Sequence, residues 1–110
     1  MVQRFEYEER VYYVYILASK ACGTLYIGVT SDIVTRLMDH REGRSTFTRR
    51  YDIKTLVYIE LFGDIQAAIQ REKTLKKWPR QWKINLIERE NRHWEDLSER
   101  FLGPPPKLKS

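Results

Sequence analysis

Two tyrosine-rich segments, residues 13–17 and 25–29, constrain the fold of this chain more than any other part of its sequence. Both are dominated by β-branched and aromatic residues, which favour strands. A turn at residues 19–22 would join them into a β-hairpin with Tyr15 directly opposite Tyr26. A register shift of one residue would turn one hydroxyl to the other face. We therefore expect a hairpin with both phenols on one face.

The other elements are predicted from helix caps, proline positions and apolar runs. In chain order they are a helix at residues 32–41, a surface loop at 44–54, a strand at 56–62, and helices at 64–78 and 79–90. Asp32 and Asp64 are suited to cap helices, and Pro79 ends one helix and begins the next. The order ββαβαα predicts an α/β (α+β) fold, a small antiparallel or mixed sheet with helices packed against it.

Length and charge limit the organisation of the chain. With 110 residues, we expect a charged N-terminal extension at 1–10, one domain at 11–97 and a proline- and lysine-containing tail at 98–110. The formal charge of +5 and the pI of about 9.4 favour a polyanionic partner such as nucleic acid. A single cysteine, no signal-peptide pattern and no long apolar run predict a cytoplasmic protein without a membrane segment.

One carboxylate is predicted to face the core. Projected at about 100° per residue, Glu72 shares a helix face with Ile65, Ala68 and Ile69. Because an unpaired buried carboxylate is costly, Glu72 should meet a cation, a metal ion or a water-filled cleft. A structural ion pair with an arginine is the alternative.

Polar groups of other kinds are also predicted to face inward. On the helix at 32–41, Arg36 and His40 lie one turn apart on the apolar side. The full set of candidate catalytic residues is Tyr15, Tyr26, Arg36, His40 and Glu72. Each alone has a structural alternative, as a core aromatic, a salt-bridge partner or a packed helix residue.

Together these groups suit hydrolysis of a phosphodiester. One Mg²⁺ or Mn²⁺ ion at Glu72 would polarise a phosphate oxygen, and Arg36 would stabilise the charge of the transition state. A tyrosine with a lowered pKa could donate or accept the proton of the nucleophile. The candidate nucleic-acid contacts are Arg44, Arg49, Arg50, Lys73, Lys76 and Lys77. A solvated helix face explains the lysines equally well.

The motifs resemble those of the GIY-YIG nucleases. Val14-Tyr15 and Tyr26-Ile27-Gly28 match the paired signature, with Tyr13 in place of the first glycine. Arg36, His40 and Glu72 follow at family-like positions. Residues 23–32 and 71–78 resemble small stand-alone bacterial members, and the resemblance spans about residues 11–97.

This resemblance implies a three-stranded antiparallel sheet flanked by helices and metal-dependent cleavage of one DNA strand per active site. It implies that Tyr26 or Tyr15 helps to activate water, that Arg36 steadies the phosphate and that Glu72 binds the metal. His40 would assist proton transfer. No small-molecule cofactor is expected, and cleavage should be structure-directed or of low sequence specificity, because the chain lacks the separate DNA-binding domain of larger members.

Some questions stay open at this level. Several family members have a supporting asparagine after the glutamate, for which Asn85 and Asn91 are the candidates here. A nucleic-acid-binding module without catalysis would use the same basic surface. An interaction module would instead expose the tryptophans, Trp78, Trp82 and Trp94. A homodimer or a protein partner is compatible with the nuclease, the binding module and the interaction module.

Overall fold

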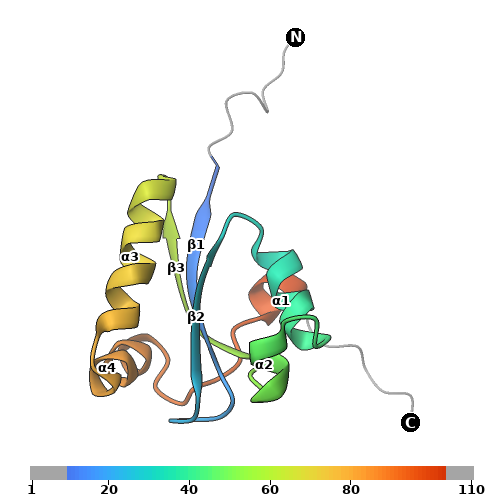
Figure 1. The fold of residues 1–110 in the computed structure, drawn as a ribbon. Helices are drawn as coiled ribbons and strands as arrows, with labels where there is room; N and C mark the ends of the chain where they lie inside the picture. Colours follow the sequence, from blue (N-terminus) through green and yellow to red (C-terminus); the bar gives the residue numbers. More distant parts are fainter. Residues whose placement is uncertain (1–9, 104–110) are drawn as a thin grey trace.

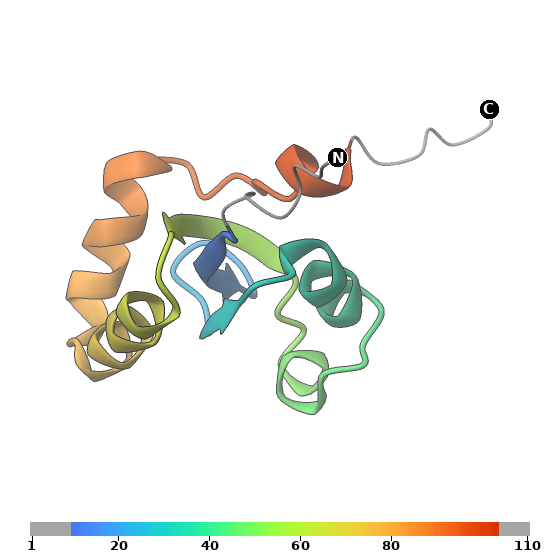
Figure 2. The ribbon, with the colours of Figure 1, turned by 90° about the horizontal axis from the view of Figure 1, so that it is seen from above.

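The computed structural model describes residues 10–103, which form a three-stranded antiparallel sheet with helices on both faces (Figures 1 and 2). The strand order is β2-β1-β3, so β1 is central and β2 and β3 are the edges. The elements are β1 Tyr12–Ala18, β2 Leu25–Thr30, α1 Ile33–Arg41, α2 Thr46–Arg50, β3 Thr55–Phe62, α3 Ile65–Lys77, α4 Arg80–Glu90 and α5 Glu99–Leu102. The predicted fold class is confirmed.

Helix boundaries follow the local chemistry of their ends. The Asp32 carboxylate accepts a hydrogen bond from the Thr35 amide at 3.1 Å, and Asp64 does the same for the Ala67 amide at 2.9 Å. Pro79 stands immediately before α4, where its missing N–H costs nothing. These ends match the predicted helices to within about two residues.

Two short helices depart from the predicted order. α2 lies within the expected surface loop, and α5 lies within the expected tail. At five and four residues, both are too short to show a helical period in the sequence. α5 is held by packing, because the ring of Phe101 meets that of Tyr13 edge-on at 5.8 Å. The folded domain therefore extends beyond residue 97, and residues 1–9 and 104–110 lie outside the described part.

The hairpin register differs from the predicted one by two residues. Ala18 pairs with Leu25, and Tyr15 faces Gly28 rather than Tyr26. The turn is longer than predicted because Ser19 and Thr24 close it with two hydrogen bonds of 3.0 Å. A two-residue shift preserves the side-chain alternation, so both phenols remain on one face, diagonally placed.

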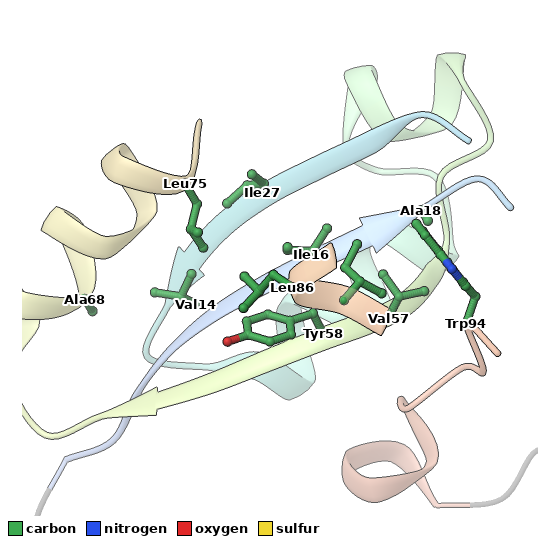
Figure 3. Close-up of a cluster of buried hydrophobic side chains, with 11 residues drawn as sticks. Val14, Ile16, Ala18, Ile27, Val57, Tyr58, Ala68, Leu75, Leu86 and Trp94 are labelled. Atoms are coloured by element: carbon green, nitrogen blue, oxygen red, sulfur yellow. The ribbon is translucent and has the colours of Figure 1, made fainter. Parts of the chain in front are cut away.

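The sheet separates two apolar clusters. Figure 3 shows the larger one, in which Val14, Ile16 and Ile27 meet α3 and α4 through Leu75 and Leu86. The opposite face buries another cluster, which consists of Tyr15, Leu17, Ile33, Leu37, Ile53 and Leu56. Successive residues of β1 thus alternate between two buried environments. No helix within residues 10–103 is long and apolar enough to cross a membrane.

Candidate active site

Four of the five predicted catalytic side chains line one cavity of about 370 Å³ beside β2 and α1. Its lining residues are Tyr15, Tyr26, Val29, Arg36, Asp39, His40, Arg44 and Ser45. They come from β1, β2, α1 and the segment that follows α1. The hairpin and the first helix after it therefore build this site together.

Gly28 makes room for the inner phenol. Tyr15 is 2% exposed, and a Cβ atom at Gly28 would lie 2.6 Å from the Tyr15 hydroxyl. Any side chain at this position would therefore displace the Tyr15 ring. Burial, and then the neighbouring Tyr26 phenol, raise the pKa of Tyr15 far above its usual value. This direction is opposite to the one expected for a phenolate base, so Tyr15 keeps its proton at neutral pH.

His40 connects Tyr15 to α2. Its Nε2 atom lies 3.3 Å from the Tyr15 hydroxyl, and its Nδ1 atom lies 2.9 Å from the Thr48 hydroxyl. Burial lowers the pKa of His40, the Arg36 charge lowers it further, and the Asp39 carboxylate opposes both. His40 is consequently neutral at pH 7, with one ring nitrogen free to accept a proton.

Tyr26 is the outer, half-buried phenol of the pair. Its ring centroid lies 6.2 Å from that of Tyr15 and 5.1 Å from that of His40. On the solvent side the aromatic contacts continue to Phe47 at 5.9 Å and from Phe47 to Tyr51 at 5.0 Å. Tyr26 is therefore the phenol more accessible to a substrate.

Arg36 lines the cavity from an exposed position, which differs from the inward placement predicted for it. Its guanidinium lies 3.4 Å from the Asp39 carboxylate, which also accepts a 2.8 Å hydrogen bond from Arg44. Asp39 and Thr48 are not among the residues predicted from the sequence. Asp39 could have been found from its spacing, because it lies three residues after Arg36 on the same predicted helix. Thr48 gives no such signal, because its five-residue helix is too short to show a helical period.

Glu72 does not line this cavity. It belongs to α3, which packs on the opposite face of the sheet from α1 (Figure 2). Its side chain is 13% exposed, and its carboxylate lies 2.6 Å from the Lys76 ammonium one turn later. The prediction that Glu72 meets a cation is confirmed, with a lysine rather than an arginine. The expected apolar face is only partly right, since Ala68 is buried but Ile65 is exposed.

The predicted DNA contacts divide between the two sides of the sheet. Arg44 lines the cavity, and Arg49 and Arg50 are exposed on α2 close to it. The lysines Lys73, Lys76 and Lys77 are exposed on α3. The two groups of basic residues therefore flank different faces of the sheet.

Neither candidate asparagine lines the cavity. Asn91 is buried and donates to the carbonyl groups of Val57 and Glu95 at 3.1 and 2.8 Å, so it joins the end of α4 to β3. Asn85 is exposed and accepts a hydrogen bond from Gln81 at 2.9 Å. Both asparagines are therefore engaged by partners outside the cavity.

The tryptophans do not form one exposed patch. Trp94 is 8% exposed and donates to the Glu88 carboxylate, whereas Trp82 is 54% exposed and packs edge-on against the half-buried Trp78. An interaction surface that uses all three is excluded.

A family model and several relatives match most of this chain. The family model described as the GIY-YIG catalytic domain matches residues 11–85, which include the hairpin, α1 and Glu72. The chain belongs to the GIY-YIG family. A UPF0213 protein of Bacillus pumilus is 38% identical over 82 residues, which cover 74% of this chain and 83% of the relative. A UPF0213 protein of Staphylococcus haemolyticus is 35% identical over 70% of this chain and 94% of its own length.

A solved structure has a similar fold. The solution NMR structure of the UPF0213 protein BH0048 from Bacillus halodurans covers 81% of this chain and 95% of its own, with a TM-score of 0.51 and 28% identity. The chain is therefore similar to small stand-alone bacterial proteins over most of its length.

Metal ligands are scarce in the described part of this GIY-YIG chain. No group of three or more histidine, cysteine, aspartate or glutamate side chains within residues 10–103 is placed to hold an ion. Mg²⁺ is commonly held by one or two carboxylates with water and substrate phosphate, and Glu72 offers one carboxylate, which is largely buried and paired with Lys76. Asp39 is already engaged by two arginines.

Proposed function

We propose that this chain is a metal-dependent endonuclease that hydrolyses phosphodiester bonds of DNA, with low sequence specificity or with selection by DNA structure. The observation that carries the proposal is the cavity that gathers Tyr15, Tyr26, His40 and Arg36, with the Tyr15 phenol beside a neutral imidazole. Membership of the GIY-YIG family supports a nuclease of this class.

The phenols and the imidazole would manage the proton of the attacking water. The half-buried Tyr26 is the phenol that meets the water. The water gives its proton to the phenol pair, and the Tyr15 proton passes to His40 Nε2, so the positive charge ends on the imidazole. The high pKa of Tyr15 suits this relay, because the tyrosine passes a proton on without remaining a phenolate.

Arg36 would bind the scissile phosphate. Its exposed guanidinium reaches into the cavity, where it can stabilise the extra charge on the phosphate oxygens as the water oxygen attacks phosphorus. The bond from phosphorus to the leaving sugar oxygen then breaks, and that oxygen takes up a proton from solvent.

Glu72 is the proposed ligand of a single Mg²⁺ or Mn²⁺ ion. Such an ion would polarise a phosphate oxygen. The Lys76 ammonium pairs with one oxygen of this carboxylate, so it would compete with the ion for the negative charge of Glu72. α3, which carries Glu72, packs against the edge strand β2 as well as the central strand β1.

The test is cleavage of single-stranded, duplex and branched DNA with and without Mn²⁺, comparing the wild type with Glu72→Ala. We expect manganese-dependent cleavage that the substitution reduces by at least about a hundredfold. The matched control is Glu95→Ala, which removes an exposed carboxylate and keeps the backbone contacts of that residue. Equal cleavage by the wild type and Glu72→Ala would refute the proposed metal ligand.

A binding module without catalysis is the competing function. It predicts salt-dependent DNA binding and no cleavage of any substrate at any manganese concentration. Arg36 separates the two readings further, because Arg36→Ala should lower turnover more than DNA affinity if its target is transition-state charge. If Arg36→Ala lowers DNA affinity and leaves turnover unchanged, Arg36 is a binding residue.

A further inference from the structure

Thr48 is a buried polar residue that neither the motifs nor the proposed chemistry explains. It lies on α2, on a segment otherwise exposed, yet its side chain is 0% exposed. Its hydroxyl is 2.9 Å from His40 Nδ1 and 3.3 Å from the Ser45 carbonyl oxygen. A buried hydroxyl with two polar neighbours must divide one proton and its lone pairs between them.

The Ser45 carbonyl determines how this hydroxyl is oriented. A carbonyl oxygen can only accept, so Thr48 donates its proton to Ser45 and turns a lone pair toward His40. His40 Nδ1 must then carry the hydrogen and donate it. Nε2 is left as the acceptor that faces the Tyr15 hydroxyl.

The opposite tautomer makes one hydrogen bond fewer. If Nε2 carried the hydrogen, Thr48 would have to donate to Nδ1, and its contact with Ser45 would place two acceptor oxygens 3.3 Å apart. Only the Nδ1–H form makes all three contacts hydrogen bonds: Tyr15 to Nε2, Nδ1 to Thr48, and Thr48 to Ser45.

We propose that Thr48 is a positioning residue that holds His40 in the Nδ1–H tautomer, so that Nε2 can receive the Tyr15 proton. Thr48 acts through His40 and does not touch the substrate. α2 therefore contributes to the proton relay as well as to the basic surface. The catalytic part of this inference rests on the proposed nuclease function, whereas the tautomer itself does not.

The tautomer can be read from the side-chain ¹⁵N shifts of histidine by NMR. The chain has two histidines, so His93→Gln assigns the His40 signals. At pH 8 we expect the Nδ1–H form in the wild type and in Thr48→Ser, which keeps the hydroxyl. Thr48→Val keeps the shape but removes the hydroxyl, and the population should move toward the Nε2–H form. The Ser45 carbonyl retains the Arg49 amide as a donor in that variant.

Thr46→Val is the matched control, because Thr46 is exposed on the same helix. Its His40 tautomer should match that of the wild type. An Nε2–H form in the wild type, or an unchanged Nδ1–H form in Thr48→Val, would overturn the inference. Backbone amide spectra establish that each variant is folded, and Thr48→Ala removes the same hydroxyl if Thr48→Val does not fold.

Cleavage adds a second readout. Thr48→Val should lower kcat by roughly tenfold with little change in KM, and Thr48→Ser should recover most of that loss. A tautomer change with undiminished kcat would separate Thr48 from catalysis. If the wild type cleaves no DNA, the proposed function fails, while the NMR result still decides the role of Thr48 in setting the tautomer.

Discussion

At the scale of single residues, the site depends on the close fit between Tyr15 and Gly28. A methyl group at position 28 would collide with the Tyr15 hydroxyl at 2.6 Å, and the buried ring has little room to move. We predict that Gly28→Ala lowers the free energy of unfolding by about 1 to 3 kcal/mol and reduces cleavage. Urea denaturation and the cleavage assay measure the two effects. Gly63→Ala is the control, because no atom lies within 4 Å of the added Cβ.

His40 predicts a pH dependence with a definite sign. Only the neutral imidazole accepts a proton, so kcat/KM should rise with pH through the His40 pKa and then level off. Burial and Arg36 lower this pKa despite Asp39, so the rise should centre below the ordinary value of 6.5. The other ionisable groups that face His40 are Tyr15 on β1 and Tyr26 on β2. A rise centred above 6.5, or the same rise in His40→Gln, would contradict the assignment.

The sequence identified some site residues and not others, for physical reasons. Tyr15 and Tyr26 were predictable because strand alternation survives a two-residue error in register. His40 was predictable from helix periodicity. Asp39 was missed although Arg36 precedes it by one helical turn, because its second partner, Arg44, lies beyond the end of α1. Thr48 was missed because it reaches His40 from a short helix in an apparent loop. The position of Glu72 relative to the cavity depends on which face of the sheet α3 covers.

At the scale of secondary-structure elements, the proposed attraction of α2 for DNA can be tested separately from the role of Thr48. It presents Arg49 and Arg50 beside the exposed rings of Phe47 and Tyr51. We predict that replacing both arginines by alanine makes the dependence of log Kd on log salt concentration shallower by about 0.7 to 0.9 per lost phosphate contact. The control is the double replacement of Arg89 and Arg92, which are exposed on and after α4. An unchanged slope in the α2 variant would remove α2 from the DNA interface.

The end of α4 should matter for stability rather than for catalysis. The Asn91 side chain makes three hydrogen bonds, two as a donor to the carbonyl groups of Val57 and Glu95 and one as an acceptor from the Glu95 amide. We predict that Asn91→Ala lowers the free energy of unfolding by about 2 kcal/mol with kcat retained in the folded fraction. Asn85→Ala, at an exposed position, should change it by less than about 0.5 kcal/mol. A selective loss of kcat in Asn91→Ala would indicate a role in the active site instead.

At the scale of the whole molecule, the central sheet places the proposed proton relay and the proposed metal ligand on different faces. Tyr15 and His40 lie on the α1 side, whereas Glu72 lies on the α3 side. β2 is an edge strand, α3 packs against it, and α1 follows it in the chain. A phosphate bound along this edge could therefore be contacted by groups from both faces of the sheet. Basic residues on α2 and α3 would then flank the same DNA from two sides. The sequence could predict the elements that meet at this edge, but their layering required the structure.

One cavity in the described part of the chain holds the Tyr15–His40 pair, which predicts the order of products from a circular duplex. One active site cuts one strand, so supercoiled plasmid should become nicked circles before any linear form appears. Because the second cut needs another encounter, the linear product should form with a lag that shortens as protein concentration rises. Agarose gels over time measure both species. Linear DNA that appears with the first nicks at low protein concentration would instead indicate an assembly with two active sites on one duplex.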